Sequence, residues 1–304
     1  MIPIDEIRAA AARLEGRVLR TPLVELDGVY LKLETLQPIG SFKLRGALNA
    51  VAQAGDVRGG VVTASAGNMG QGVAWAAREL GITCSVVAPE NAPETKLAAI
   101  ERLGGRIVKV PHERWWQALE ESGYPDLPGV FVHPVQDEAV MAGNGTIGLE
   151  LVEDLPELDV VLVPLGGGGL SVGIASAVKA LRPEARVYAV EPETGAPVTA
   201  AFEAGEPVPV EFRPSFVDGA GGPAVLPKMW PHLRETLDGA FAVSLEETAA
   251  SVRLLAGRAN VVAEGAGALA LAASGRVDGT VACIVSGGNI DPAKLATILE
   301  GRTP

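Results

Sequence analysis

The chain has 304 residues, of which 48% are apolar and 20% are charged, so it can bury the core of one large domain or of two smaller lobes. Its formal net charge of −12 argues against nucleic acid as a partner, because binding a polyanion requires clustered Lys and Arg side chains. Aromatic residues make up only 4% of the chain, which favours an aliphatic core of parallel strands covered by helices.

Short apolar segments rich in Val and Ile alternate with longer Ala-rich stretches at helical spacing, a pattern typical of repeated βα units. In chain order the pattern predicts strands at Tyr30 to Leu33, Gly60 to Ala64, Thr83 to Ala88, Arg106 to Val110, Asp159 to Pro164, Arg186 to Val190 and Thr280 to Ser286. It predicts helices at Phe42 to Gln53, Asn68 to Leu80, Pro93 to Leu103, Glu138 to Glu153, Leu170 to Leu181, Leu245 to Gly257 and Gly265 to Ser274. Gly205 to Pro214 contains three prolines and is interpreted as an irregular surface connection. The predicted class is α/β with parallel sheets.

Two features bear on where the protein resides. No segment approaches the roughly 18 apolar residues of a membrane span, and the N-terminus lacks the basic start and apolar core of a signal peptide. Cys84 and Cys283 lie in apolar, strand-like runs, where buried free thiols are expected. We therefore expect a cytoplasmic protein with no membrane partner.

The strongest phosphate signal is the run Gly166-Gly167-Gly168-Gly169, which follows an apolar strand and precedes an Ala-rich helix. Residues without a Cβ let backbone N–H groups approach an anion, and the helix N-terminus adds its dipole. A dinucleotide site is the competing interpretation, because Gly166 and Gly168 begin a G-x-G-x-x-S pattern with Glu191 downstream. Ser171 stands where that pattern requires a third glycine.

Lys43 lies in the segment Gly40-Ser41-Phe42-Lys43-Leu44-Arg45-Gly46, at the first turn of a predicted helix with Ser41 as a candidate N-cap. The N–H groups of a helix start favour the neutral amine that attacks aldehydes. Taken alone, an ordinary solvated lysine is the commoner outcome.

Two further strand-to-helix or strand-end turns carry polar groups. Ser65, the N–H groups of Ala66 to Met69 and the Asn68 amide form a donor-rich turn that suits a carboxylate, although a simple helix cap is the alternative. Ser286-Gly287-Gly288-Asn289 follows a buried strand, and a structural turn is its alternative interpretation.

In this order and spacing, the four segments resemble the fold-type II (tryptophan synthase beta-like) pyridoxal-phosphate enzymes, specifically the threonine and serine dehydratases and serine racemase. The resemblance covers nearly the whole chain, through Arg20-Thr21-Pro22-Leu23, Ala88 to Pro93 with Lys96, His133-Pro134, Ala142 to Thr146, Asp218-Gly219 and Glu264 to Ala268. It implies two open parallel-sheet α/β lobes with the cofactor between them, in a homodimer. We assign residues 1–58 and 139–304 to a large lobe and 59–138 to a smaller inserted lobe.

The resemblance also implies a role for each motif residue. Lys43 would hold pyridoxal 5'-phosphate as a Schiff base, with Phe42 on one face of the pyridine ring and Gly219 near the other. Asn68 would contact the ring oxygen and Ser286 the ring nitrogen. The phosphate would be held by the loop and helix start made of Gly166, Gly167, Gly168, Gly169 and Leu170. The substrate carboxylate would be bound by the turn made of Ser65, Ala66, Gly67, Asn68 and Met69.

The implied reaction is α,β-elimination, in which L-threonine, L-serine or a related β-hydroxy amino acid yields a 2-oxo acid and ammonia. Racemisation or β-replacement on the same scaffold is the alternative, and a nicotinamide-binding protein that uses the glycine loop is a distant one. Ala66 stands where racemases of this group carry a serine, which favours the dehydratase. Met69 replaces the histidine usual after the asparagine, so larger substrates such as a phenylserine or a hydroxyaspartate stay open.

Two other departures concern regulation and metals. The group's cation site uses two acids, of which Glu191 is present while Pro197 occupies the second position, so no metal is predicted. His112, His133 and His232 are scattered and are interpreted as structural or surface residues. The chain has no room after Ser286 for the regulatory domain of biosynthetic threonine deaminases, so we expect no inhibition by isoleucine.

Overall fold

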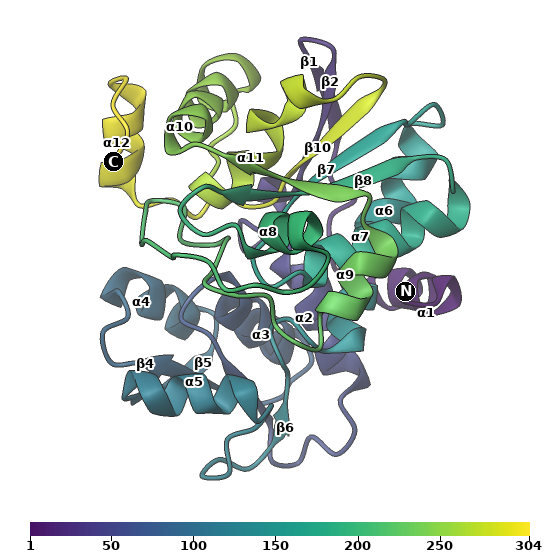
Figure 1. Cartoon of the computed structure of the whole chain (residues 1–304). Coiled ribbons are helices and arrows are strands. Elements are labelled where there is room, and N and C mark those ends of the chain that lie inside the picture. The colour runs from purple at the N-terminus through teal and green to yellow at the C-terminus, as the bar shows by residue number, and fades with distance from the viewer.

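The β-branched segments of the chain pair into two separate sheets, which a computed structural model of residues 1–304 shows one above the other in Figure 1. The larger sheet has the order β1-β2-β10-β7-β8-β9. Its strands are β1 (Leu23–Leu26), β2 (Val29–Leu33), β10 (Val281–Val285), β7 (Val160–Pro164), β8 (Arg186–Pro192) and β9 (Gly239–Val243). Only the β1–β2 hairpin is antiparallel. The first strands of the chain thus lie beside the last one.

The smaller sheet is wholly parallel and has the order β5-β4-β3-β6. Its strands are β3 (Val61–Ala64), β4 (Cys84–Pro89), β5 (Gly105–Val110) and β6 (Val130–Phe131). All of them fall within residues 59–138, which agrees with an inserted lobe. The position at which the two lobes divide stays a prediction.

Alternate residues of the large sheet enter two cores, because successive side chains of a strand point to opposite faces. Val161 and Val163 pack in one core with α6 (Glu138–Asp154) and α7 (Gly169–Leu181). Val160 and Leu162 pack in the other with α10 (Leu245–Leu254) and α11 (Gly265–Ala272). Both faces are therefore covered, as the aliphatic composition predicts.

A third core joins the small sheet to α2 (Lys43–Gln53) and α3 (Asn68–Glu79). α2 contributes Leu44, Leu48 and Val51 to it, and also contacts α6, which packs on the large sheet. Each sheet with the helices that cover it is called a unit below, the large unit and the small unit. The helix that begins at Lys43 is therefore held between the two units, as Figure 1 shows.

The predicted α/β class and the predicted strands and helices are confirmed to within a few residues, with some elements added. The sequence reading missed α1 (Ile4–Leu14), α5 (His112–Glu120), α8 (Pro197–Ala204), α9 (Trp230–Thr236), α12 (Pro292–Leu299), β1, β6 and β9. α4 (Glu94–Arg102) begins one residue later than predicted, and α10 continues as a π-helical turn at Leu255–Ala259. Residues 205–214 contain no helix or strand, as predicted.

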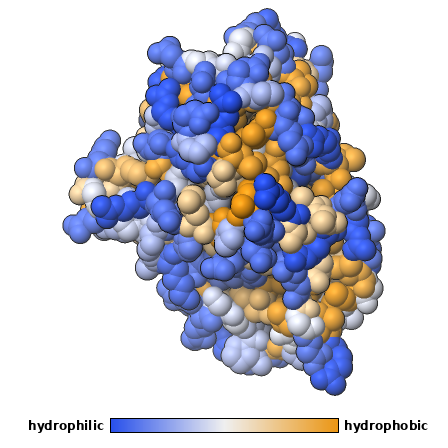
Figure 2. All heavy atoms as spheres, turned by 90° about the vertical axis from the view of Figure 1, so that its right-hand side faces the viewer, coloured by the Kyte–Doolittle hydropathy of each residue, from blue (hydrophilic) through white to orange (hydrophobic).

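The face that carries α1, which lies at the right of Figure 1, is mainly hydrophilic, with patches of apolar residues between the hydrophilic ones (Figure 2). None of the helices combines the length and apolar composition that crossing a bilayer requires.

Candidate active site

A pocket of about 350 Å³ lies between the two units, at the carboxyl ends of their parallel strands, where open α/β sheets bind ligands. Lys43 lines this pocket, and it also lines an adjoining cavity of about 50 Å³ formed by the glycine run. Both spaces share Phe42, Lys43, Gly219, Ala266 and Ser286. Four of the predicted segments therefore meet at the Lys43 amine.

Lys43 begins α2, and its Nζ lies 3.4 Å from the carbonyl oxygen of Pro134 and 5.0 Å from the centre of the Phe42 ring. Burial lowers the pKa of this amine to about 8, against the opposing charge of Glu264. A substantial fraction of the amine is thus neutral slightly above neutral pH, the state that a nucleophile or a base needs.

The prediction that Ser41 is the N-cap of α2 is wrong. Phe42 occupies the N-cap position, and the hydroxyl of the fully buried Ser41 has no hydrogen-bond partner. The reason is a competing backbone contact, because Ser41 forms an antiparallel bridge with Gly287 and the Phe42 N–H donates to the Ser286 carbonyl at 2.9 Å. The end of β10 therefore fixes the start of α2.

Arg45, two residues after Lys43, holds the first turn of α2 in place through its contacts with Glu34 and Glu150. Its guanidinium is 1% exposed and donates to Glu34 at 2.8 and 2.9 Å and to Glu150 at 2.6 and 3.0 Å. Two carboxylates from different elements thus hold one buried cation, which is the bidentate geometry that arginine favours.

The glycine run leads from β7 into α7, and Gly168 has φ +98°, a conformation that glycine adopts without strain. Side chains could not replace these glycines, since a Cβ on Gly167 would lie 2.4 Å from Val135 Cγ2. A Cβ on Gly166 would lie 3.1 Å from the Gly219 carbonyl oxygen. The N–H groups of Gly169, Leu170 and Ser171 in the first turn of α7 have no partner within the helix, which suits a phosphate.

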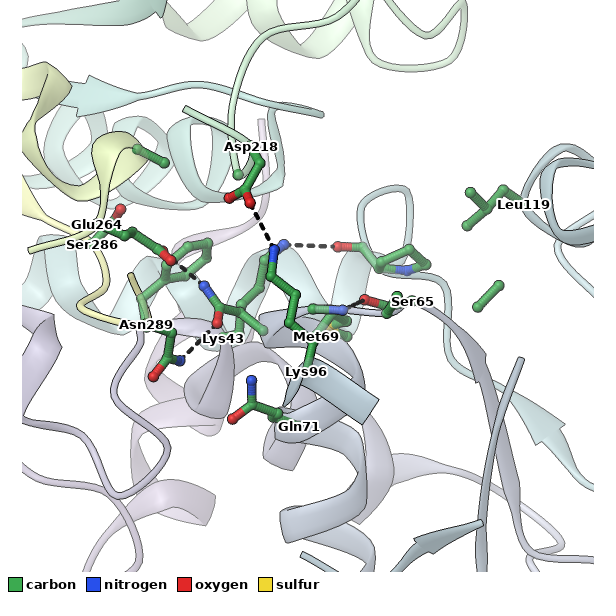
Figure 3. Close-up of a pocket in the computed structure, with 18 of the residues that line it drawn as sticks. Lys43, Ser65, Met69, Gln71, Lys96, Leu119, Asp218, Glu264, Ser286 and Asn289 are labelled. Carbon is green, nitrogen blue, oxygen red and sulfur yellow. Dashed lines mark hydrogen bonds and ion pairs between the residues drawn. The ribbon is translucent and has the colours of Figure 1, made fainter. Parts of the chain in front are cut away.

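Asn68 begins α3 and joins the two units. Its Nδ2 donates to Glu264 Oε1 at 2.8 Å, and its Oδ1 accepts from Asn289 Nδ2 at 2.7 Å (Figure 3). Burial and the charge of Asp218 raise the pKa of the Glu264 carboxyl to about 7, against the Asn68 hydrogen bond. Asn68 is therefore held in one orientation by a partly protonated acid and an amide.

The turn before α3 places its predicted residues at the pocket wall. Ser65 Oγ accepts from the Gly67 N–H at 3.2 Å, which orders the turn. Ala66 lines the pocket and packs against Ala88, Ala92 and Leu97. Its side chain is a methyl group, so the wall carries no hydroxyl at this position. Met69 lines the pocket while being only 2% exposed, because most of its side chain packs in the third core.

The sequence analysis assigned no site role to several residues that line the pocket, although it quoted Lys96, Asp218 and Glu264 within the segments of the family resemblance. Lys96 of α4 and Asp218 form an ion pair at 2.8 Å and point toward each other in Figure 3. Trp115 and Leu119 add an apolar wall from α5, and Leu119 stands apart from the polar groups at the right of the view. Glu264 was the one with a usable signal, since a carboxylate amid apolar and glycine residues is seldom buried without a function.

Glu191 lies outside the pocket and is engaged elsewhere. Its carboxylate accepts from the N–H groups of Val198 at 3.1 Å and Thr199 at 2.8 Å, and from the Thr199 hydroxyl at 2.8 Å. It therefore caps the start of α8 and is not free for a ribose hydroxyl. No three His, Cys, Asp or Glu side chains cluster in a way that could hold a metal ion.

The residues present fit the cofactor that the resemblance implies. A partly neutral lysine amine lies beside an aromatic ring. The glycine loop lies next to this amine, and side chains at the glycine positions would fill the space beside the loop. The Ser286 hydroxyl lines both spaces and is close to fully buried, so it offers a neutral partner for a ring nitrogen. Four separate groups thus match the amine-reactive aldehyde, the phosphate and the pyridine ring of pyridoxal phosphate.

Comparisons with known proteins agree with this assignment. A family model described as "Pyridoxal-phosphate dependent enzyme" matches residues 14–287. L-threonine ammonia-lyase of Thermotoga maritima is 40% identical over 99% of this chain and 79% of its own length. The crystal structure of a T.th. threonine deaminase superposes with a TM-score of 0.88 at 37% identity, covering 94% of this chain and 98% of that one. Maize serine racemase gives 0.89 at 31% identity, covering 98% and 97%. With a family model that spans most of its length and relatives above 30% identity that align over nearly the whole chain, the chain belongs to the pyridoxal-phosphate dependent enzymes.

Proposed function

We propose that this enzyme is a pyridoxal-phosphate dependent ammonia-lyase, a dehydratase that converts L-threonine, L-serine or a related β-hydroxy amino acid to a 2-oxo acid and ammonia. The observation that carries the proposal is the position of Lys43, whose amine stands where the glycine-loop cavity meets a pocket wall with no hydroxyl at Ala66. The similarity to threonine ammonia-lyase and threonine deaminase supports the same reaction.

The substrate would be bound by two sets of groups. The turn from Ser65 to Met69 would receive its carboxylate, since the first N–H groups of α3 have no partner within the helix. Trp115 and Leu119 would face its side chain, because they form the apolar wall of the pocket. The glycine loop would hold the cofactor phosphate and Ser286 its ring nitrogen.

When bound, pyridoxal phosphate supplies an electron sink for the pair of electrons left at the substrate Cα. Lys43 would take the Cα proton on Nζ, and its lowered pKa makes the amine a base near neutral pH. The other titratable groups of the pocket are already engaged, Lys96 by Asp218 and Glu264 by Asn68. Loss of the β-hydroxyl as water then leaves an enamine, which tautomerises and is hydrolysed to the 2-oxo acid and ammonia.

Racemisation is the second candidate, favoured by the similarity to serine racemase. It requires an acid on the face of Cα that Lys43 does not reach, and Ala66 has no proton to give there. Ala66 therefore supports elimination as the main reaction.

We propose in addition a homodimer in the cytoplasm. The dimer follows from the family resemblance, and the location agrees with two cysteines that are both free and buried.

The deciding experiment is an absorbance spectrum of the purified protein with pyridoxal phosphate, followed by a screen of β-hydroxy amino acids for release of 2-oxo acid. Chiral analysis of the remaining amino acid separates elimination from racemisation. L-alanine is the matched control substrate, because it has no β-hydroxyl to lose. A protein without the visible cofactor band, or D-serine formation that outpaces pyruvate formation, would contradict the proposal.

A further inference from the structure

His133 is buried at the connection between β6 and α6, and both of its ring nitrogens are used. Nδ1 accepts from the backbone N–H groups of Val135 at 3.0 Å and Gln136 at 2.9 Å. Because Nδ1 faces two donors, the proton of the neutral ring is on Nε2, which lies 3.1 Å from the Leu119 carbonyl oxygen and donates to it. Burial lowers the pKa of this histidine to about 4, so the ring is neutral near neutral pH.

The turn that the ring fastens, residues 133–136, touches the active site at two points. The Pro134 carbonyl oxygen accepts from Lys43 Nζ at 3.4 Å. Val135 packs against the glycine loop, since a Cβ on Gly167 would lie 2.4 Å from its Cγ2 and one on Gly169 would lie 2.9 Å from its carbonyl oxygen. One turn therefore contacts both the amine and the phosphate loop.

The other side of the ring holds α5. Leu119 is in the last turn of that helix, and its carbonyl oxygen accepts from His133 and from the Ser122 N–H at 3.3 Å. The Leu119 and Trp115 side chains form the apolar pocket wall. The ring thus joins the wall that faces the substrate to the turn that faces the cofactor.

We propose that His133 is a positioning residue. Through its two ring nitrogens it fixes the position of the Pro134 carbonyl that accepts from Lys43, the packing of Val135 against the glycine loop, and the wall of the pocket formed by α5. It touches none of the reacting atoms itself. The effect on substrate rests on the proposed function, whereas the effects on Lys43 and on cofactor binding do not.

Two substitutions separate the two halves of the ring. In His133→Asn the amide oxygen occupies the place of Nδ1 and keeps the turn, but the side chain no longer reaches Leu119. In His133→Gln the longer amide reaches Leu119 and the acceptor of the turn is lost. His232→Asn on α9 is the matched control, because that histidine lies outside the pocket.

The measurements are the dissociation constant of pyridoxal phosphate, the pH dependence of its visible absorbance on the protein, and kcat and KM for L-threonine. We expect His133→Gln to weaken cofactor binding about tenfold and to displace the absorbance titration, since two buried N–H groups lose their acceptor. We expect His133→Asn to keep both within about twofold and to raise KM with little change in kcat, because only the wall is loosened.

The proposal is overturned if both variants change all readouts in parallel, or if they lower the melting temperature while cofactor affinity, titration and KM stay at wild-type values. Those results would describe a merely structural histidine. Should His133→Gln fail to fold, Val135→Ala tests the same seat of the glycine loop, and unchanged cofactor affinity in it overturns the proposal. If the wild type consumes no β-hydroxy amino acid, the proposed function fails, while cofactor affinity and titration still decide the role of His133.

Discussion

The Asn68 amide donates to Glu264 Oε1 at 2.8 Å, and this hydrogen bond connects the small unit to the large one. No sequence motif predicts it. Glu264 also acts on Lys43, because its charge opposes the burial that lowers the pKa of the amine. The two residues thus couple the orientation of Asn68 to the basicity of the lysine.

We expect Glu264→Gln to lower the pKa of Lys43 below its value of about 8. Removing the carboxylate removes the charge that favours the ammonium form, while the Gln oxygen can still accept from Asn68. Since cofactor capture needs the neutral amine, the pH at which cofactor-free protein binds pyridoxal phosphate at half its maximal rate should fall. Glu203→Gln at an exposed position is the control, and a midpoint that rises would refute this coupling.

Lys43→Ala should abolish the visible band of the bound cofactor and reduce turnover of L-threonine by about 1,000-fold or more, because both the covalent link and the base are lost. Spectroscopy and 2-oxo acid release measure the two effects. The Lys96→Ala variant should keep the band, since its amine pairs with Asp218. A band that persists in Lys43→Ala means that another lysine holds the cofactor.

Ala66→Ser should add a racemase activity. Ala66 lines the pocket wall. The family resemblance implies that a hydroxyl at this position would face the side of Cα that Lys43 does not serve, where it could exchange a proton. D-serine formed from L-serine is measured by chiral chromatography, with Ala293→Ser at an exposed site as the control. No increase in the ratio of D-serine to pyruvate would show that the missing hydroxyl does not determine the reaction.

Arg45→Met should destabilise the fold by about 3–5 kcal/mol, because the buried Glu34 carboxylate would lose its cation and Glu150 would keep only Lys32. Equilibrium unfolding in urea measures the change. Arg58→Met is the control, since it removes an exposed ion pair with Asp56 and should leave the free energy of unfolding nearly unchanged. Similar values for the two variants would mean that the buried network contributes no more than a surface pair.

Magnesium and a chelator such as EDTA should each change kcat/KM by less than about twofold. The Glu191 carboxylate already accepts three hydrogen bonds from Val198 and Thr199, and Pro197 stands where a second acid would be needed. Assays of chelator-treated protein with stepwise added Mg²⁺ or Mn²⁺ provide the measurement. Saturable activation would show that the capping contacts open for a cation.

The fold was largely predictable because its buried parallel strands form continuous apolar runs, as at Val160–Pro164. The missed elements lack such a signal. β9 (Gly239–Val243) begins with a glycine and is half-exposed, and α5 (His112–Glu120) mixes charged, polar and aromatic residues and buries only Ala118. Pairing and packing partners distant in sequence stabilise both, and local pattern does not contain those partners.

The candidate site was predictable where glycine and polar residues interrupt an apolar pattern at a strand end, as around Gly166 and Ser286. Trp115 and Leu119 were not predictable, because only the packing of α5 on the small sheet brings them to the pocket. The N-cap at Ser41 failed for a related reason, since a contact with Gly287 outweighs the local preference of a serine.

The bridge between Ser41 and Gly287 also governs when the site can exist. β10 pairs with β2, and its end fixes the start of α2, so residues 281–287 must be synthesised before Lys43 reaches its place. A ribosome-bound chain that lacks residues 281–289 contains Lys43 but not the strand end that fixes the start of its helix. Because β10 is the last strand to be synthesised, Lys43 reaches its buried position only after all the other strands have been made.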